Sequence, residues 1–341
     1  MSLRPLISAL LAAALFGAST PAAKLLVGSL HPVLLAGLLY AGSGIGLSLW
    51  LVATRTPLRL APADSMWLAL AIAFGGIAGP IMLMAGLAGT SAASGALLLN
   101  LEGVFTALIA WFAFRENFDA RIALGMALIV AGGILLALQP GALALDSGAC
   151  LVAGACLAWA IDNNLTRKVS AGDAVAIAAL KGIVAGAVNL CIATALDASW
   201  PGIATVAAAG IVGLLGYGIS LVLFVVALRE LGAARTGAYF STAPFVGVAV
   251  SLAVLGETPN ALFWPATALM LAGVWLHVSE RHEHEHAHEP LEHEHRHVHD
   301  EHHRHEHEFA WDGREPHAHR HRHAPLVHRH PHYPDLHHRH H

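Results

Sequence analysis

One acidic residue stands alone in a long apolar part of the sequence. Between Met66 and Phe114 the only charged side chain is Glu102. A charged group at the centre of a lipid bilayer costs about 2.5–3.5 kcal/mol on insertion scales, so by default it marks a functional site or a buried pair. In such a place a carboxylate can exchange a proton or bind a cation. Glu102 is therefore the leading candidate for substrate binding and coupling, and a structural acid paired with Lys181 or hydrogen-bonded to neighbouring helices is the alternative.

Three further polar residues interrupt the apolar sequence of the second half. Lys181 is a partner for Glu102, a cation for substrate carboxylates, or a side chain that extends to the aqueous surface. Asp162 and Asn163, in the segment DNN at 162–164, indicate a polar gate or a set of ligands. A polar helix end at the membrane interface explains the same segment equally well.

Three tyrosines, Tyr40, Tyr217 and Tyr239, also lie within apolar stretches. Tyrosine presents an apolar ring and a hydroxyl group, which suits the wall of a substrate cavity. It is also enriched where helices meet the membrane surface. Both interpretations stay open at this stage.

A second chemistry lies at the other end of the chain, where 23 of the 25 histidines fall at or beyond His282. Histidine recurs at alternate positions over much of 282–307, so in an extended chain the imidazoles share one face. Neutral imidazole suits Zn, Ni, Cu and Co. The first candidate metal ligands are His282, His284, His286, His288, His293, His295, His297 and His299. Because such tracts cannot build a packed core, the sequence predicts a disordered, metal-binding extension.

The elements that would hold Glu102 are long apolar helices. The chain is 56% hydrophobic and 12% charged, against roughly 45–50% and 25% in a soluble domain. Crossing about 30 Å of hydrocarbon takes about 20 apolar residues per helix. The sequence predicts an all-α membrane protein with ten transmembrane helices, at 6–27, 32–54, 66–87, 91–114, 121–138, 148–166, 174–195, 204–228, 234–255 and 261–279.

Basic residues predict how these spans are oriented. Ten Lys and Arg residues flank one side of the predicted bundle, whereas the loops on the other side contain none. The positive-inside rule places the basic side in the cytoplasm. Both termini, and with them the histidine-rich extension, are then expected to be cytoplasmic.

The sequence contains an internal repeat. Residues 91–116 align without gaps with residues 232–257, and residues 16–24 align with residues 159–167. Each half carries five spans, and because five is odd the second half is upside down relative to the first. Inverted repeats of this kind characterise secondary transporters, in which the substrate site lies between the halves.

The paired segments LLLNLEGVFTALIAWFAFRE and FSTAPFVGVAVSLAVLGE, in spans 4 and 9, resemble the EamA repeats of the drug/metabolite transporter superfamily. The resemblance covers residues 5–280. It implies a first repeat at 5–138 and a second at 148–280, followed by the disordered extension at 281–341. It also implies transport of amino acids, other small metabolites or drugs.

Interrupted stretches at matched positions of the two halves point to the substrate site of such a transporter. In span 4, Asn100 is followed by Gly103, which stands where the family commonly has proline. In span 9, Ser241 is followed by Pro244. Lys24 is similar to a lysine that the family carries in span 1, either at the mouth of the cavity or as an anchor at the membrane surface.

Together with these observations, the resemblance implies a secondary transporter that exports small metabolites such as amino acids or amines across the bacterial inner membrane. It would work by alternating access between two inverted repeats, with proton coupling through Glu102. The sequence has no phosphate-binding glycine loop with lysine, no G-x-S-x-G and no H-E-x-x-H, so no enzyme is expected. No cofactor is expected either, apart from Zn, Ni or Co ions bound by the extension.

Two other functions are weighed against this one. The expected partners are the lipid bilayer, a small-molecule substrate and divalent metal ions, and no nucleic acid. A divalent metal exporter supplied by the extension, or a non-transporting metal-sensing membrane protein, would use the same partners. The spans hold no histidine at mid-depth, because His31 and His277 lie near span ends. Metabolite transport is therefore favoured.

Overall fold

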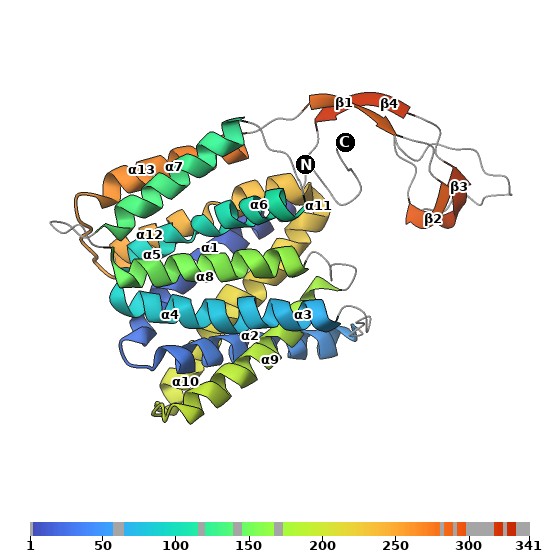
Figure 1. Ribbon diagram of the computed structural model, residues 1–341. Helices are drawn as coiled ribbons and strands as arrows, with labels where there is room; N and C mark the ends of the chain where they lie inside the picture. The colour runs from blue at the N-terminus through green and yellow to red at the C-terminus, as the bar shows by residue number, and fades with distance from the viewer. Residues whose placement is uncertain are drawn as a thin grey trace. The chain divides into compact units, whose positions relative to one another are not determined.

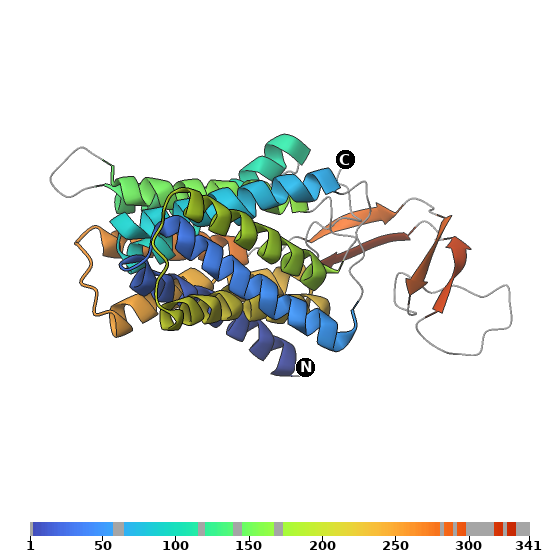
Figure 2. The same ribbon diagram turned by 90° about the horizontal axis from the view of Figure 1, so that it is seen from below.

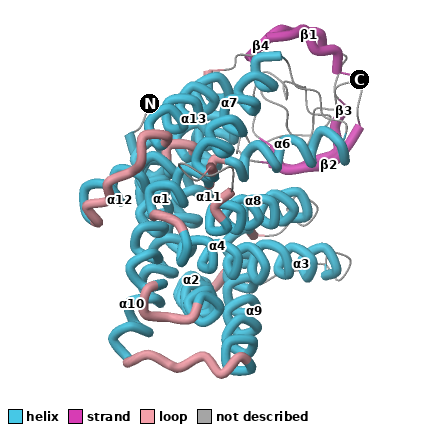
Figure 3. The backbone as a smooth tube through the Cα atoms, turned by 60° about the vertical axis from the view of Figure 1, so that its left-hand side comes forward, coloured by secondary structure: helices cyan, strands magenta, loops and turns pink. Residues whose placement is uncertain are grey.

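The chain divides into two compact units, Met1–Glu280 and Arg281–His341. The first unit is a bundle of helices, and the described strands all belong to the second (Figures 1 and 3). The computed structural model describes residues 3–56, 65–114, 120–138, 145–166, 173–279, 283–288, 292–297, 317–322 and 326–331.

Helices make up the first unit almost completely. In chain order they are α1 (Leu3–Val27), α2 (Pro32–Thr54), α3 (Ser65–Ala71), η2 (Ile72–Ala78), α4 (Gly79–Gly89), α5 (Ala92–Leu98), α6 (Leu101–Phe114), α7 (Ala120–Ala137), α8 (Ser147–Thr166), α9 (Ala174–Ala195), α10 (Ile203–Gly213), η4 (Leu214–Ile219), α11 (Ser220–Phe240), α12 (Ala243–Val254) and α13 (Phe263–Val278). The segments η2 and η4 are π-helical turns within longer spans.

Helix α11 contains the end of one span and the start of the next. The rings of Phe224 and Phe240 have centroids 4.9 Å apart, whereas sixteen residues of straight helix would separate them by about 24 Å. Phe16 of α1 also touches both Tyr217 and Phe240. The chain therefore reverses direction between Phe224 and Phe240, where the sequence places the connection between spans 8 and 9.

The described helices account for the ten predicted spans. Eight stretches are long and apolar enough to cross a membrane, and α12 and α13 are shorter apolar helices. Because consecutive spans alternate in direction, counterparts five spans apart run in opposite directions (Figure 1). The prediction of an all-α membrane protein built from two inverted five-helix repeats is confirmed.

Polar residues begin several helices where the apolar sequence is interrupted. Ser91, Asp146 and Asp173 each accept a hydrogen bond from a backbone N–H two or three residues further on. His31 does the same with its Nδ1, ahead of Pro32 at the start of α2. Such caps satisfy N–H groups that no helical carbonyl can reach. They stabilise the starts of these helices.

Helices at equivalent positions of the two repeats pack against each other. Helices α2 and α9 lie side by side (Figure 2), and a Cβ atom added to Gly182 would come within 2.6 Å of the Cα atom of Gly44. Helices α7 and α13 form a second such pair, in which a Cβ atom on Gly273 would lie 2.6 Å from the carbonyl oxygen of Gly125. Small residues thus let backbones approach closely, as membrane helices require.

The two repeats also share their irregularities. Span 4 is broken at residues 99–100 and span 9 at residues 241–242, within one residue of the offset that aligns the two sequences. The π-helical turns η2 and η4 fall at the same offset, in spans 3 and 8. The expected interruptions at matched positions are therefore present in the backbone.

The extension contains two antiparallel ribbons. Strand β1 (Glu283–His288) pairs with β4 (Leu326–Pro331), and β2 (Glu292–His297) pairs with β3 (His317–Arg322). In these stretches the backbone is extended and paired, where the sequence analysis expected a chain without regular structure. An alternating sequence suits a strand, because its side chains repeat every two residues.

Candidate functional site

The break in span 4 puts Glu102 at the start of a helix. Glu102 lies in the first turn of α6, directly after the turn at residues 99–100. Asn100 is buried and donates a hydrogen bond from Nδ2 to the carbonyl oxygen of Leu97, at 2.8 Å. This bond satisfies a carbonyl at the end of α5 and stabilises the break. A carboxylate in a first helical turn is favoured by the N–H groups that point toward it.

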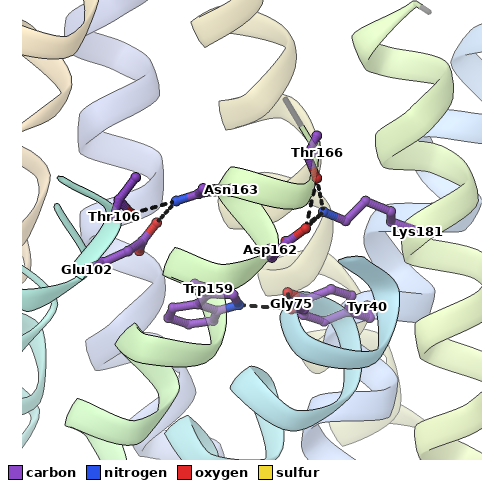
Figure 4. Close-up of polar contacts among 9 residues, drawn as sticks. All are labelled: Tyr40, Gly75, Glu102, Thr106, Trp159, Asp162, Asn163, Thr166 and Lys181. Carbon is purple, nitrogen blue, oxygen red and sulfur yellow. Dashed lines mark hydrogen bonds and ion pairs between the residues drawn. The ribbon is translucent and has the colours of Figure 1, made fainter. Parts of the chain in front are cut away.

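The hydrogen-bond partner of Glu102 is a neutral amide. Asn163 donates from Nδ2 to Oε1 of Glu102 at 2.9 Å and lies 3.4 Å from Oγ1 of Thr106 (Figure 4). Asn163 is exposed and Glu102 is partly exposed. Pairing of Glu102 with Lys181 was wrong, because Lys181 binds another acid. The other structural alternative, a hydrogen bond to a neighbouring helix, is present, because Asn163 belongs to α8.

That other acid is Asp162. Nζ of Lys181 lies 2.5 and 2.6 Å from the two carboxylate oxygens of Asp162, and the two side chains are 17% and 10% exposed. Thr166 donates to Oδ1 of Asp162 at 2.9 Å. Lys181 therefore does not extend to the aqueous surface, and its charge is already compensated within the bundle.

The side chains of the segment DNN, which lies in α8, contact two neighbouring helices. Successive helical residues point about 100° apart, so Asp162 meets α9 while Asn163 meets α6 (Figure 4). Asn164 donates to the carbonyl oxygens of Thr106 and Ala160. Asp162 and Asn164 are buried, so these residues do not form a solvated helix end.

The π-helical turn η2 lies beside the Asp162–Lys181 pair. The carbonyl oxygen of Gly75 accepts hydrogen bonds from the hydroxyl of Tyr40, at 2.8 Å, and from Nε1 of Trp159, at 2.9 Å. The carbonyl oxygen of Gly76 accepts one from Nδ2 of the fully buried Asn189, at 2.9 Å. A π turn displaces the normal helical hydrogen bonds, and these side chains complete the bonding. Tyr40 thus acts inside the bundle and not in an interfacial belt.

Gly75 also makes room for Asp162. A Cβ atom at position 75 would lie 1.8 Å from Oδ2 of Asp162, which is far shorter than a van der Waals contact. The absence of a side chain at Gly75 therefore lets Asp162 sit between η2 and Lys181. The sequence analysis missed this role, because nothing distinguishes Gly75 from the other glycines of the spans.

Aromatic rings continue the site toward spans 1 and 8. The ring of Tyr217, in η4, lies 6.0 Å from that of Phe16 and 5.7 Å from that of Tyr40. All three are partly exposed. Tyr239 and Ser241 lie at the break of span 9, where the backbone turns before α12. Tyr239 and Ser241 therefore lie at the second-repeat counterpart of the break beside Asn100 and Glu102.

Two charged residues hold the connection between spans 3 and 4. Lys24 donates from Nζ to the carbonyl oxygens of Leu87 and Thr90, where α4 ends. Glu257 accepts from the backbone N–H groups of Ala92 and Ala93, at 2.7 and 2.8 Å, where α5 begins. Each charge has the sign that the helix end attracts. We call this arrangement the Lys24–Glu257 clamp.

The clamp changes the interpretation of Lys24. Its amino group caps a helix and is not directed into the site around Glu102. Glu257 was missed in the sequence analysis, although the gapless repeat alignment contained a signal. Glu257 aligns with Glu116, so both repeats keep an acid at the same position.

Comparison with known proteins agrees with this architecture. The model of the EamA-like transporter family matches residues 3–138 and 146–279. The chain belongs to the EamA-like transporter family. An uncharacterized transporter of Methanothermobacter thermautotrophicus is 28% identical over 294 residues, which are 79% of this chain and 84% of that protein. The protein is thus a multi-pass membrane transporter and not an enzyme.

A protein of known crystal structure shares the fold of this EamA-like transporter. It is 19% identical, with a TM-score of 0.59, over 79% of this chain and 95% of the other. At that identity the likeness concerns the fold alone.

The histidines proposed as metal ligands lie mostly in the strands of the extension. The first two strands contain His284, His286, His288, His293, His295 and His297. His282 and His299 lie outside the described residues. Among the side chains that the structure describes, no three His, Cys, Asp or Glu residues are grouped so that they could hold one ion.

Replacing Gly75 with alanine should displace Asp162 from Lys181, because the new methyl group needs the space of the carboxylate. Loss of a buried ion pair costs about 3–5 kcal/mol, so we expect a lower unfolding temperature in detergent, followed by intrinsic fluorescence. Gly103→Ala is the matched control, because its Cβ atom would meet nothing within 4 Å. Equal unfolding temperatures for the two variants would contradict the packing described for Gly75.

The Asp162–Lys181 pair can be tested with a double-mutant cycle. Asp162→Asn and Lys181→Met each leave one buried charge without its partner and should lower the free energy of unfolding by about 3–5 kcal/mol. The double variant removes both charges and should lose less than the sum of the two. Additive losses in detergent unfolding would show that the two residues act independently.

Proposed function

We propose that this EamA-like transporter exports small metabolites that carry an amine, such as amino acids or amines, in exchange for protons. The observation that carries the proposal is the environment of Glu102. It is a partly exposed carboxylate in the interrupted middle of span 4, and its hydrogen-bond partner Asn163 is neutral.

The contrast with Asp162 explains why Glu102 is the coupling residue. Lys181 lies 2.5 Å from the carboxylate of Asp162 and compensates its charge. No further cation is therefore required to neutralise Asp162. Within the described part of the chain, the carboxylate of Glu102 accepts a hydrogen bond from the neutral amide of Asn163 and forms no ion pair. A proton and a substrate ammonium group can each neutralise it, but not both at once. Competition for one carboxylate is the simplest form of exchange between a proton and an amine.

Aromatic residues support a cationic or amphipathic substrate. The faces of Phe16, Tyr40 and Tyr217 belong to one cluster, which lies at the level of the two π-helical turns. An aromatic face attracts an ammonium group and also accepts an apolar side chain. These rings therefore suit an amino acid or an apolar amine better than a multiply charged anion.

The direction of transport follows from the proposed orientation. Helix α1 begins, α2 ends and α13 ends on one side of the bundle (Figure 1), where Arg4 and Arg55 are found. The positive-inside rule supports a cytoplasmic location for this side, in a bacterial inner membrane. Both termini would then be cytoplasmic, and protons entering from outside would drive the export of amines.

The Lys24–Glu257 clamp supports alternating access. It joins span 1 and the end of span 9 to the connection between spans 3 and 4, on the side away from the termini. While the clamp is formed, the helix ends on this side are held together. We assign it the role of an outer latch, which must open before a substrate can leave to the outside.

The extension has an accessory role in this proposal. It would bind Zn, Ni or Co ions on the cytoplasmic side, because its histidines supply imidazole ligands. A metal path through the bundle would need several such ligands at depth, and the described spans offer Glu102 and a paired Asp162 instead. Transport of a metabolite, with metal binding confined to the extension, is therefore the function that the geometry supports best.

Glu102→Gln tests the coupling. Glutamine keeps the oxygen that accepts from Asn163 but cannot exchange a proton, so we expect the fold to persist and proton-driven transport to be lost. The assay is uptake of labelled amino acids and amines by proteoliposomes under an imposed pH gradient. Glu102→Asp, which keeps the carboxylate, should retain part of the activity. Unchanged gradient-driven transport by the glutamine variant would refute the proposal.

Glu257→Gln tests the outer latch. A neutral amide accepts weaker hydrogen bonds than a carboxylate, so the ends of α5 and α12 should separate more often. A cysteine at Ala96, which packs against Gly247, should then react faster with a membrane-impermeant maleimide, in a background without the native cysteines. Asp197→Asn is the control, because Asp197 is an exposed acid on the same side. Equal labelling rates in both variants would argue against a latch.

A further inference from the structure

An open apolar groove lies between α6 and α8, at the surface of the helical unit. It is lined by Phe105, Leu108, Ile109, Phe112 and Ala113 of α6 and by Leu157 of α8. Its volume of about 430 Å³ lies within the range of small-molecule sites. Phe112 is 74% exposed and Leu157 is 43% exposed, so the groove is reached from outside the bundle. The lining side chains are apolar and suit a hydrocarbon chain.

On α6, one end of the groove lies close to Glu102. Phe105 and Ile109 follow Glu102 by three and seven residues, and these spacings place side chains on one side of a helix. From Phe105 the lining continues to Ala113, over about 12 Å of helix at a rise of about 1.5 Å per residue. The groove therefore begins about one helical turn from the carboxylate.

Helix α8 places the same end of the groove at the break of span 4. Cys156, which precedes Leu157, donates from Sγ to the carbonyl oxygen of Leu98, at 3.5 Å. Leu98 is the last residue of α5, so Leu157 lies beside the break. Both helices thus bring the near end of the groove to the turn that positions Glu102.

Asn164 supplies a hydrogen-bond acceptor without a donor. Its Nδ2 donates to the carbonyl oxygens of Thr106 and Ala160, and these two bonds fix which end of the amide is the oxygen. Oδ1 of Asn164 is buried and has no hydrogen-bond partner within the described part of the chain. Asn164 follows Leu157 by seven residues, so it lies on the side of α8 that lines the groove. Because an unpaired buried acceptor is unfavourable, an N–H donor on a ligand would stabilise this site.

These features favour an amine over a lipid as the occupant of the groove. A phospholipid keeps its phosphate at the membrane surface, so its chain would end in a methyl group beside Glu102 and leave the carboxylate uncompensated. An ammonium group has the opposite charge and donates N–H bonds, which Glu102 and Asn164 can both accept. Charge complementarity therefore selects a chain that ends in an amine.

We propose that the groove binds the hydrocarbon chain of an amphipathic primary amine, whose ammonium group is bound by Glu102 and by Oδ1 of Asn164. The substrate class is then an alkylamine or an arylalkylamine, with its chain lying along α6 from Phe105 toward Ala113. The inference rests on the proposed amine exchange at Glu102 and adds where the apolar part of the substrate binds.

Photolabelling tests the location of the chain. The probe is decylamine with a diazirine at the end of its chain, added to the protein in lipid nanodiscs, and labelled peptides are identified by mass spectrometry. The label should fall on residues 105–113, and excess decylamine should remove it. Glu102→Gln should reduce labelling at low probe concentration by about tenfold or more, because it removes the charge that binds the ammonium group. Asp197→Asn, which changes an exposed acid just after α9, is the control and should leave labelling unchanged.

Filling the far end of the groove tests its use by long chains. Ala113→Phe puts a large side chain where the end of decylamine would lie, so the Kd for decylamine should rise by about fivefold or more. Butylamine is too short to reach Ala113 and should keep its Kd, which also shows that the variant is folded. Ala123→Phe is the matched control, because Ala123 is an exposed alanine of α7 outside the groove. Each Kd is measured by calorimetric titration in nanodiscs, where the partition of an amine into lipid cancels between variants.

The role of Asn164 can be tested without any substitution. Decyltrimethylammonium keeps the charge and the chain of decylamine but has no N–H to donate to Oδ1. After correction for partition into protein-free nanodiscs, its Kd should exceed that of decylamine by about fivefold or more, because the buried acceptor stays unpaired. Equal Kd values would refute the role assigned to Asn164.

The outcomes separate this inference from the proposed function. Labelling of residues 105–113 that Glu102→Gln leaves unchanged would show a groove that accepts any hydrocarbon, lipid included, and would refute the inference. Glu102-dependent labelling elsewhere, or equal effects of Ala113→Phe and Ala123→Phe, would refute the groove while amine exchange at Glu102 stands. If neither butylamine nor decylamine binds in a manner that depends on Glu102, the proposed function fails as well.

Discussion

The structure depends on one constraint: within hydrocarbon, every carbonyl and every charge must find a partner inside the bundle. This constraint applies directly to the π-helical turn in span 3, because the turn diverts the carbonyl oxygens of Gly75 and Gly76 from normal helical bonding. Tyr40, Trp159 and Asn189 satisfy them from three other helices. The same turn accommodates Asp162, which holds Lys181. Local irregularity in the first repeat is thus completed by side chains of both repeats.

Against this background, Glu102 differs from Asp162 in that its hydrogen-bond partner is the neutral amide of Asn163. Asp162 and Asn163 are consecutive in the chain, yet one belongs to a closed ion pair and the other contacts Glu102. Helix α8 therefore separates the Asp162–Lys181 ion pair from the Glu102–Asn163 hydrogen bond.

The two repeats have similar backbones but carry different polar side chains at aligned positions. Both contain a broken helix and a π-helical turn at matched positions. The alignment places Ala243 opposite Glu102 and Leu39 opposite Lys181. A symmetric backbone suits alternation between two related conformations, whereas the proposed coupling residue, Glu102, belongs to the first repeat.

The sequence by itself determined the number of spans, the inverted repeat and the location of the breaks, because hydrophobic length and self-similarity are local properties of the chain. It also identified Glu102 as exceptional, since a lone charge among apolar residues is visible without a structure. Only the tertiary structure decided the partners. Lys181 binds Asp162 and not Glu102, and Lys24 caps α4, because helix rotation and packing choose among acceptors that the sequence leaves equivalent. Gly75, Asn189 and Glu257 acquire their roles in the same way, from neighbours that are between 35 and 165 residues away along the chain.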